Sequence, residues 1–123
     1  MFKTLLIIGV GGGLGSMARY LVQFAAAKSL LGAFPFGTFI VNITGSLLIG
    51  IVFGFSDRMT GISPEWRIFL ATGFCGGFTT FSTFSYENLA LLRDGNYLYF
   101  MLYSILSLIL GLGATLLGLV ITR

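Results

Sequence analysis

The side chains whose types and spacing could do chemistry lie in one stretch in the middle of the chain, residues 73–85. Phe81 and Phe84 are three positions apart and alternate with hydroxyl side chains that include Ser82 and Thr83. Residues at this spacing share one face of a helix. Because the edge of an aromatic ring is positive, ring edges and hydroxyls together can hold an anion weakly, without a full positive charge. Since the chain has thirteen phenylalanines, the alternative is that the pair simply packs against core or lipid.

The backbone of the same stretch is predicted to be broken. It lies at the centre of a long apolar segment, residues 66–92, which would otherwise form one helix. The centre contains Gly76 and Gly77, then four hydroxyl residues within five positions. Glycine is a poor helix former, and hydroxyl side chains compete for backbone hydrogen bonds. Non-helical backbone at membrane depth persists only where it is buried in protein or lines a wet cavity, so a break near residue 79 would mark a functional site.

The elements that must position these groups are membrane-spanning helices. Of the 123 residues, 56% are hydrophobic and only 9% are charged, whereas a soluble domain carries roughly a quarter charged residues. A bilayer needs about 20 apolar residues per helix, and the segments that qualify are residues 4–27, 36–55, 66–92 and 97–122. We expect a single-domain, all-α integral membrane protein with four transmembrane helices, the third broken near the bilayer midplane, and both termini on one side.

The composition also argues against several classes of protein. There is no histidine for acid–base work and no group of metal-ligating side chains, and the single cysteine, Cys75, cannot form an intramolecular disulfide. No run of basic residues suggests nucleic acid. Residues 5–16 look like a strand followed by a glycine-rich dinucleotide loop, but no acidic residue follows about 20 positions later. We therefore expect neither an enzyme nor a protein that binds nucleotides or nucleic acid.

Glycines four residues apart recur inside the predicted helices, at positions 9 and 13, 11 and 15, and 50 and 54. Small residues at this spacing let helix backbones approach closely in lipid. We expect tight packing within the bundle and, because four helices make a thin bundle, packing between subunits as well.

The basic residues are spread almost evenly between the two membrane surfaces. Four lie at the helix ends that face the termini, and three lie towards the other side. A strong excess on one side would fix a single orientation. The balance permits insertion both ways and hence an antiparallel, dual-topology homodimer; the alternative is that so few charges give a meaningless count. The first group is Lys3, Arg58, Arg67 and Arg123, and the second is Arg19, Lys28 and Arg93.

Polar side chains in the predicted helices reach a similar depth, roughly 8–12 Å below the surface opposite the termini, at about 1.5 Å of helix per residue. They are Arg19, Asn42, Glu87 and Tyr103, and together they indicate a polar vestibule. Arg19 pairing with Glu87 is one interpretation, and Arg19 reaching the headgroups is the other. One helical turn beyond Tyr103, Ser107 continues a polar track, unless its hydroxyl bonds back to its own helix.

The predicted break also offers carbonyl groups to a cation. In an antiparallel dimer the two-fold axis lies in the membrane plane, so the midplane breaks of both copies would meet on it. The carbonyls freed at Gly76 and Thr79 of each copy would then form a ring that suits a desolvated monovalent cation and not an anion. Such an ion would hold the dimer together.

Three segments carry a resemblance to a known family. They are residues 12–20, residues 38–46 and, most specifically, residues 76–84, which read GGFTTFSTF. On these segments the chain resembles the Fluc (CrcB) family of fluoride channels, and the resemblance extends over its whole length.

The resemblance implies a dual-topology antiparallel homodimer in the lipid bilayer, with two fluoride pores and a structural sodium ion at its centre. Phe81 and Phe84 would be the pore phenylalanines, the backbone carbonyls of Gly76 and Thr79 would ligate sodium, and Asn42 would line the vestibule. The family is passive, so fluoride would leave the cytoplasm down its gradient through the bacterial inner membrane, which confers fluoride resistance. The remaining polar contacts of the pore would be Ser82, Thr83, Tyr103 and Ser107; where some members have a further hydroxyl, this chain has Gly111.

Two other functions fit parts of the sequence. Small proton-coupled multidrug exporters are also four-span, dual-topology dimers of about this length, but they depend on a carboxylate in the first span. Residues 4–27 contain Arg19 and no acidic residue. A non-transporting membrane scaffold would explain the glycines but not a broken third span with clustered hydroxyls.

Overall fold

Helices account for most of the described chain. The computed structural model describes residues 1–29, 32–57 and 61–122. Two long helices come first, α1 (Phe2–Ser29) and α2 (Phe36–Ser56), and one comes last, α6 (Tyr97–Ile121). Between them a third segment consists of α3 (Pro64–Arg67), a π-helix η1 (Ile68–Cys75), α4 (Gly76–Phe78) and α5 (Phe81–Arg93). These bounds agree within two residues with those predicted for the apolar segments.

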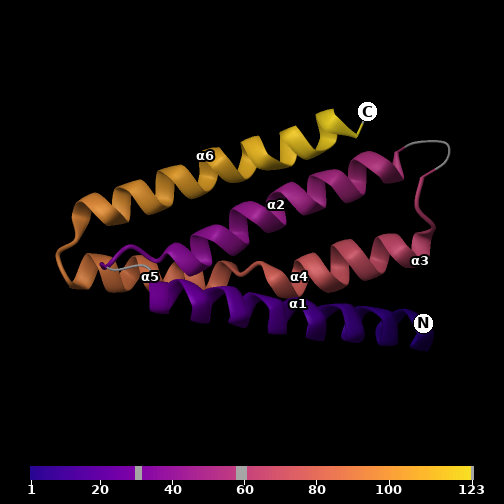
Figure 1. The fold of residues 1–123 in the computed structure, drawn as a ribbon, viewed down its shortest axis with the longest axis horizontal. Coiled ribbons are helices and arrows are strands. Elements are labelled where there is room, and N and C mark those ends of the chain that lie inside the picture. The colour runs from indigo at the N-terminus through magenta and orange to yellow at the C-terminus, as the bar shows by residue number, and fades with distance from the viewer. Residues whose placement is uncertain (30–31, 58–60, 123) are drawn as a thin grey trace.

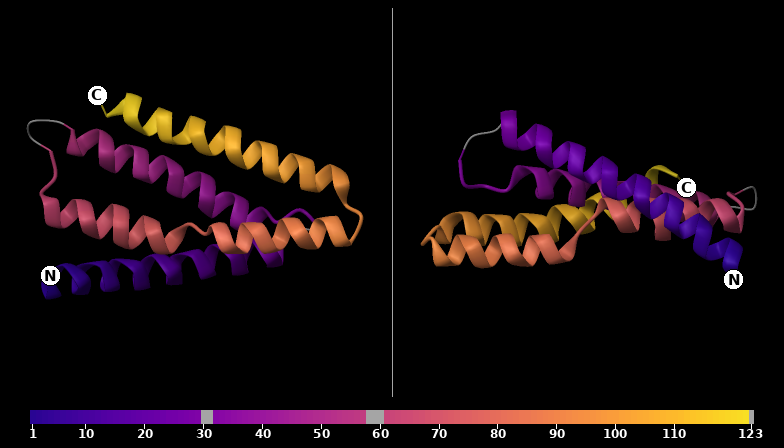
Figure 2. Two further views of the ribbon diagram at one scale, coloured as in Figure 1. Left: turned by 180° about the vertical axis from the view of Figure 1, so that it is seen from behind. Right: turned by 90° about the horizontal axis from the view of Figure 1, so that it is seen from below.

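The long helices and the third segment lie side by side, and the chain reverses direction from each to the next (Figure 1). Both termini lie at the same end of the bundle, as expected if both are on one side of the membrane. Seen from below, α1 runs obliquely across the other helices (Figure 2). Its middle lies against η1 and α4, so α1 supports the third segment where that segment is interrupted.

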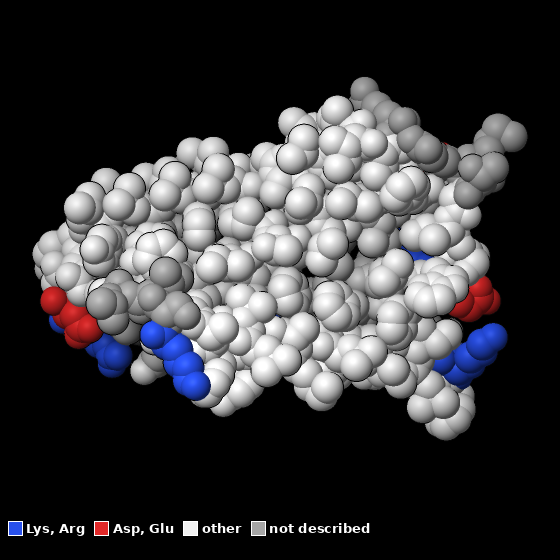
Figure 3. Space-filling view, viewed as in Figure 1, with Lys and Arg blue, Asp and Glu red and all other residues white. Residues whose placement is uncertain are grey.

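Apolar side chains cover the outside of the molecule rather than being collected in a core. Tyr103 is fully buried, whereas many leucines, isoleucines and phenylalanines are exposed. On the face shown in Figure 3, acidic and basic side chains gather at the two ends. The helices long and apolar enough to cross a bilayer are Phe2–Lys28, Phe36–Ser56 and Tyr97–Ile121. Such a surface is suited to lipid, and the protein is a multi-pass membrane protein.

The third segment is interrupted at Thr79 and Thr80, where the backbone is extended (φ −92°, ψ 158° and φ −151°, ψ 121°). A break near residue 79 is therefore confirmed. Gly76 and Gly77 do not form it, because both lie in the helical turn α4. Within this segment, which is described throughout, no single helix is long enough to span a bilayer. A fourth crossing stays a prediction, based on the third segment running alongside its neighbours from end to end (Figure 1).

Glycines allow α1 to pack closely against the third segment. A Cβ atom at Gly15 would overlap a backbone carbonyl of η1, and one at Gly77 would overlap the carbonyl of Gly12. This close approach, and not flexibility, explains why glycine stands at position 77 inside a helix. Gly9 and Gly13 differ, because nothing lies within 4 Å of where their Cβ atoms would be. That side of α1 faces outward.

The predicted charge balance can be located only in part. Lys3 and Arg67 lie at the end of the bundle that holds the termini, and Lys28 and Arg93 lie at the opposite end. Arg58 and Arg123 lie outside the described residues. The orientation of the chain in a membrane therefore stays a prediction.

Candidate ion-binding site

Asn42 holds the interrupted backbone in place. Thr80 donates its N–H to Oδ1 of Asn42 over 2.8 Å, and Nδ2 of Asn42 donates to the Thr80 carbonyl over 3.1 Å. The Thr80 hydroxyl accepts from the N–H of Thr83 over 3.2 Å and so caps the start of α5. Asn42 therefore lies at the level of the break, one helical turn further along α2 than Thr38, which bonds to Glu87. Its amide replaces the helical hydrogen bonds that Thr80 lacks.

Two carbonyl oxygens at the break are left without donors. In an unbroken helix the N–H groups of Thr80 and Thr83 would bond to the carbonyls of Gly76 and Thr79. Here those N–H groups bond to Asn42 and to the Thr80 hydroxyl instead. Among the described residues no donor reaches the Gly76 or Thr79 carbonyl. Carbonyl oxygens are the ligands that hard cations take, so this donor set fits the expected sodium site.

Arg19 is bonded to the break and not to Glu87. Its Nε–H donates to the carbonyl of Gly77 over 3.0 Å, while Glu87 accepts hydrogen bonds from two other residues. The expected pair between Arg19 and Glu87 is not formed among the described residues, and whether Arg19 reaches the headgroups stays a prediction. The oblique course of α1 (Figure 2) brings Arg19 to the end of α4, where a positive charge interacts favourably with the carbonyls of a helix C-terminus.

A cavity of about 610 Å³, here called the middle cavity, opens beside the break. The Phe81 side chain is 78% exposed, and its ring centroid lies 5.8 Å from that of Phe84. The hydroxyl oxygen of Ser107 is buried and has no hydrogen-bond partner among the described residues, so it does not bond back to its own helix. The middle cavity therefore brings together two aromatic rings and an unused hydroxyl. Its lining includes Asn42, Gly76, Thr79, Phe81, Phe84 and Ser107.

Ser82 and Thr83 stand in the first turn of α5 and are not among the residues that line the middle cavity. The Thr80 hydroxyl oxygen lies 3.3 Å from the hydroxyl oxygen of each. The N-terminus of a helix carries a partial positive charge and N–H groups without helical partners. These two residues therefore add hydroxyls at a helix end that favours anions.

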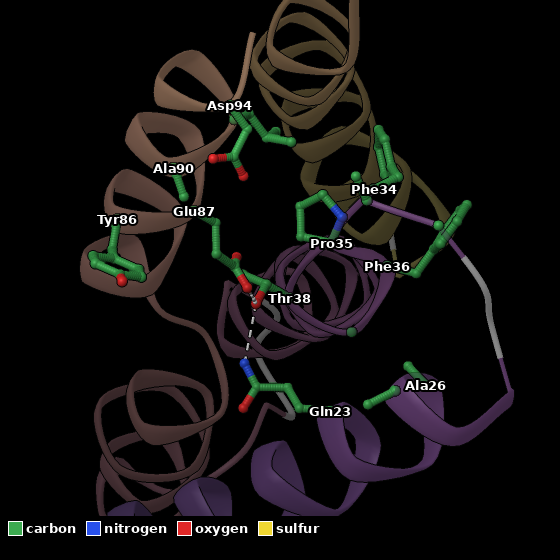
Figure 4. A pocket seen from close by; sticks show the side chains of 15 residues that line it. Gln23, Ala26, Phe34, Pro35, Phe36, Thr38, Tyr86, Glu87, Ala90 and Asp94 are labelled. Atoms are coloured by element: carbon green, nitrogen blue, oxygen red, sulfur yellow. Dashed lines mark hydrogen bonds between the residues drawn. The ribbon is translucent and has the colours of Figure 1, made fainter. Parts of the chain in front are cut away.

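A second cavity, of about 520 Å³ and here called the far cavity, opens at the end away from the termini (Figure 4). Glu87 lines it and accepts two hydrogen bonds. Tyr103 donates to Oε1 over 2.9 Å, and Thr38 donates to Oε2 over 3.0 Å. Nε2 of Gln23 donates in turn to the Thr38 hydroxyl over 3.1 Å. Polar side chains from four helices therefore meet at this end. The common depth predicted for the vestibule residues is wrong in part, because Arg19 and Asn42 bond to the break instead.

Tyr103 lies between the two cavities. Its ring is fully buried, with the ring centroid of Phe84, in the middle cavity, 4.9 Å away. The ring centroid of Phe34, in the far cavity, lies 5.5 Å away on another side. Tyr103 therefore contacts residues of both cavities, because it packs against Phe84 and donates its hydroxyl to Glu87. The polar track predicted from Tyr103 to Ser107 along α6 stays a prediction, since Ser107 lines the middle cavity and Tyr103 lines neither cavity.

The structure adds polar residues that sequence reasoning does not single out. Gln23 and Thr38 line the far cavity. Ser46 lines the middle cavity, and its hydroxyl donates to the Asn42 carbonyl over 2.7 Å. The Ser46 oxygen also lies 3.7 Å from where a Cβ at Gly111 would be, so a hydroxyl is present beside the position where Gly111 lacks one. The available signal was their polarity inside apolar segments.

Comparison with known proteins bears on the resemblance carried by residues 76–84. The family described as CrcB-like protein, Camphor Resistance (CrcB), matches residues 6–119. The chain belongs to the CrcB family. The match to CrcB includes the break, both cavities and all the residues that line them.

Similar curated proteins share one name, fluoride-specific ion channel FluC. The protein from Leptospira interrogans is 47% identical over 116 residues, which cover 94% of this chain and 91% of that protein. The one from Flavobacterium psychrophilum is 48% identical over 121 residues, or 98% of each chain. The one from Bacteroides fragilis is 51% identical over 119 residues, covering 94% of this chain and 93% of that protein. These CrcB relatives match the chain from end to end.

Proposed function

We propose that this protein is a passive, fluoride-selective channel of the bacterial inner membrane. The names of its relatives support fluoride as the ion. The observation that carries the proposal is the middle cavity, where Phe81 and Phe84 meet the unpartnered hydroxyl of Ser107. No charged side chain is among the described residues that line it. An anion would therefore find several weak contacts and no full charge that would hold it too tightly.

Fluoride is smaller than chloride and holds its water more tightly, so a selective route must replace that water with close donors. The proposed route supplies hydroxyl groups, one side-chain amide and the positive edges of aromatic rings. Each contact is weak, so an ion that enters can also leave. The residues assigned to the route are Asn42, Phe81, Ser82, Thr83, Phe84, Tyr103 and Ser107, with Glu87 in the vestibule at the far cavity.

We also propose that two copies pair in antiparallel orientation, which gives two routes per dimer. The breaks of both copies would then meet on the two-fold axis. The Gly76 and Thr79 carbonyls of each copy would hold a structural sodium ion, which would offset the partial negative charge of the carbonyls and hold the copies together. This proposal is supported by the carbonyls that lack donors and by apolar side chains exposed beside the middle cavity, such as Phe81 and Leu108.

The biological role follows from the acid–base chemistry of fluoride. In acidic surroundings fluoride crosses membranes as the neutral weak acid and dissociates in the cytoplasm. A passive channel lets the anion leave down its gradient without nucleotide hydrolysis. Loss of the protein should therefore make cells sensitive to fluoride, most strongly at acidic external pH.

The test is efflux from proteoliposomes loaded with fluoride or with chloride and measured with ion-selective electrodes. Purified protein should release fluoride far faster than protein-free liposomes do, and chloride no faster. Equal release of both anions would contradict selectivity. Release that requires a proton gradient would contradict a passive channel and favour a coupled exporter.

A further inference from the structure

A chain of hydrogen bonds across three helices links Gln23 through Thr38 to Glu87 at the far cavity (Figure 4), and Tyr103 adds a bond from a fourth helix. Gln23 lies on α1, Thr38 on α2, Glu87 on α5 and Tyr103 on α6. Gln23 donates to Thr38 over 3.1 Å, and Thr38 donates to Glu87 over 3.0 Å. Tyr103 donates to the other carboxylate oxygen over 2.9 Å. Gln23 therefore acts on Glu87 only through Thr38.

The direction of each bond follows from the protons available. A threonine hydroxyl has one proton, and an ionised carboxylate only accepts hydrogen bonds. Because the amide of Gln23 donates to the Thr38 oxygen, the Thr38 proton is left to go to Glu87. An acceptor at position 23 would compete for that proton and could leave Oε2 of Glu87 without a donor.

The orientation of Glu87 matters because no basic group faces it. Among the described residues that line the far cavity there is a second carboxylate, Asp94, but no lysine or arginine. The two hydroxyl donors hold the Glu87 carboxylate in place and offset part of its charge. An anion that passes Tyr103 is repelled by a nearby carboxylate, and it is repelled less by one whose oxygens are held by hydroxyl donors.

We propose that Gln23 is a positioning residue of the anion route. By donating to Thr38, it directs the Thr38 proton to Glu87 and keeps that carboxylate turned away from the passing ion. This inference rests on the proposed fluoride route. Gln23 is not itself assigned to the route. Through Thr38 it would nevertheless affect the negative charge that the ion meets at the far cavity.

The first experiment compares two variants in fluoride efflux. Gln23→Met removes the amide at similar size, and Gln23→Glu keeps the size but replaces a donor by an acceptor. Efflux should fall about fivefold in Gln23→Met, the effect of roughly one lost hydrogen bond, and further in Gln23→Glu. Thr38→Val removes the hydroxyl that donates to Glu87 and should lower efflux at least as much as Gln23→Met. The matched control is Thr122→Val, at another buried threonine, whose hydroxyl bonds to its own helix; it should conduct like the wild type.

The second experiment repeats Gln23→Met in a Glu87→Gln background. A glutamine at position 87 carries no charge, so Gln23→Met should then change efflux by less than about twofold. The inference is overturned if Gln23→Met conducts like the wild type, or if it lowers efflux equally in both backgrounds. If Gln23→Met does not fold, Thr38→Val in both backgrounds gives the same comparison. A wild-type protein that conducts no fluoride would contradict the proposed function instead, so the two failures are distinguishable.

Discussion

Ser107 carries a hydroxyl that the fold leaves unused. Serines inside apolar helices usually bond back to a carbonyl of their own helix, as Ser56 does to Val52 over 2.8 Å. The Ser107 oxygen is buried and bonds to none of the described residues. Burying a polar group without a partner costs about 1–3 kcal/mol. A hydroxyl that destabilises the fold in this way is better explained by contact with an ion than by contact with protein.

Replacing Ser107 by alanine should have opposite effects on stability and on flux. The free energy of unfolding should rise by about 1 kcal/mol, because an unsatisfied buried group is removed. Fluoride efflux should fall about fivefold, because the ion loses one donor. Thermal unfolding in detergent and electrode measurements on proteoliposomes provide the two readouts. Ser56→Ala is the matched control and should change the free energy of unfolding and the fluoride efflux only slightly. A loss of stability in Ser107→Ala would show instead that Ser107 supports the fold.

Phe81 and Phe84 allow ring chemistry to be separated from packing. Phe81 is 78% exposed, whereas the Phe84 ring packs 4.9 Å from that of Tyr103. Leucine keeps an apolar side chain but has no positive ring edge. Phe81→Leu and Phe84→Leu should each lower fluoride efflux roughly 2- to 10-fold, for a loss of about 0.5–1.5 kcal/mol per ring contact.

The control for these two variants is Phe24→Leu, since Phe24 is an exposed α1 residue outside both cavities. It should conduct like the wild type. Wild-type efflux in both pore variants would defeat the assignment of these rings to the anion route.

In the interrupted third segment, some features could be predicted from the sequence and others could not. Its bounds and its break depend on local composition, namely apolar length and clustered hydroxyls, so both could be predicted. The π-helix η1 and the helical state of Gly77 could not be predicted, because the sequence does not reveal how closely α1 approaches this segment at Gly12 and Gly15. A glycine that lets another helix approach looks, in sequence, the same as a glycine that breaks a helix.

Contacts between elements are the least predictable part of the site. Depth counted along straight helices places Arg19 near Glu87, but the oblique course of α1 (Figure 2) brings Arg19 to Gly77. The bonds of Gln23 and Thr38 depend on how α1, α2 and α5 are rotated against one another, which hydropathy does not reveal. Family resemblance identifies pore residues by position, and it says nothing about which side chains orient them.

Two hydrogen bonds between Asn42 and Thr80 hold the interrupted backbone of the third segment. Asn42→Leu leaves the N–H and the carbonyl of Thr80 without their partners, so the free energy of unfolding should fall by about 2–4 kcal/mol. Fluoride efflux should fall with it. Thermal unfolding and amide hydrogen exchange at Thr80 are the measurements. Asn88→Leu removes a buried asparagine that accepts one bond from Ser104 over 3.2 Å, so it should destabilise the protein less. Wild-type exchange at Thr80 in Asn42→Leu would contradict the assignment of Asn42 to holding the break.

At the scale of the whole molecule, the long helix α1 and the carbonyls at the break favour the proposed second copy. Its α1 helix of 28 residues is about 42 Å long, more than the roughly 30 Å of a hydrocarbon core, which agrees with its oblique course. Among the described residues no donor reaches the Gly76 or Thr79 carbonyl at the middle of the bundle, and lipid cannot satisfy them. A second copy that brings the same carbonyls to a shared cation would satisfy both chains at once. In an antiparallel pair the two-fold axis lies in the membrane plane, so breaks near the midplane of both copies could meet on that axis.

Dual orientation can be tested by labelling single cysteines from one side of the membrane. Cys75→Ala removes the native, buried cysteine, and Glu65→Cys and Tyr97→Cys then place an exposed thiol at either end of the bundle. If the chain inserts both ways, an impermeant maleimide should label about half of each variant in intact cells and all of it after permeabilisation. The near balance of basic residues predicts this result, because Asp and Glu contribute little to orientation. A single orientation would instead label nearly all of one variant and almost none of the other, and then neither the antiparallel dimer nor a cation on its axis could be maintained.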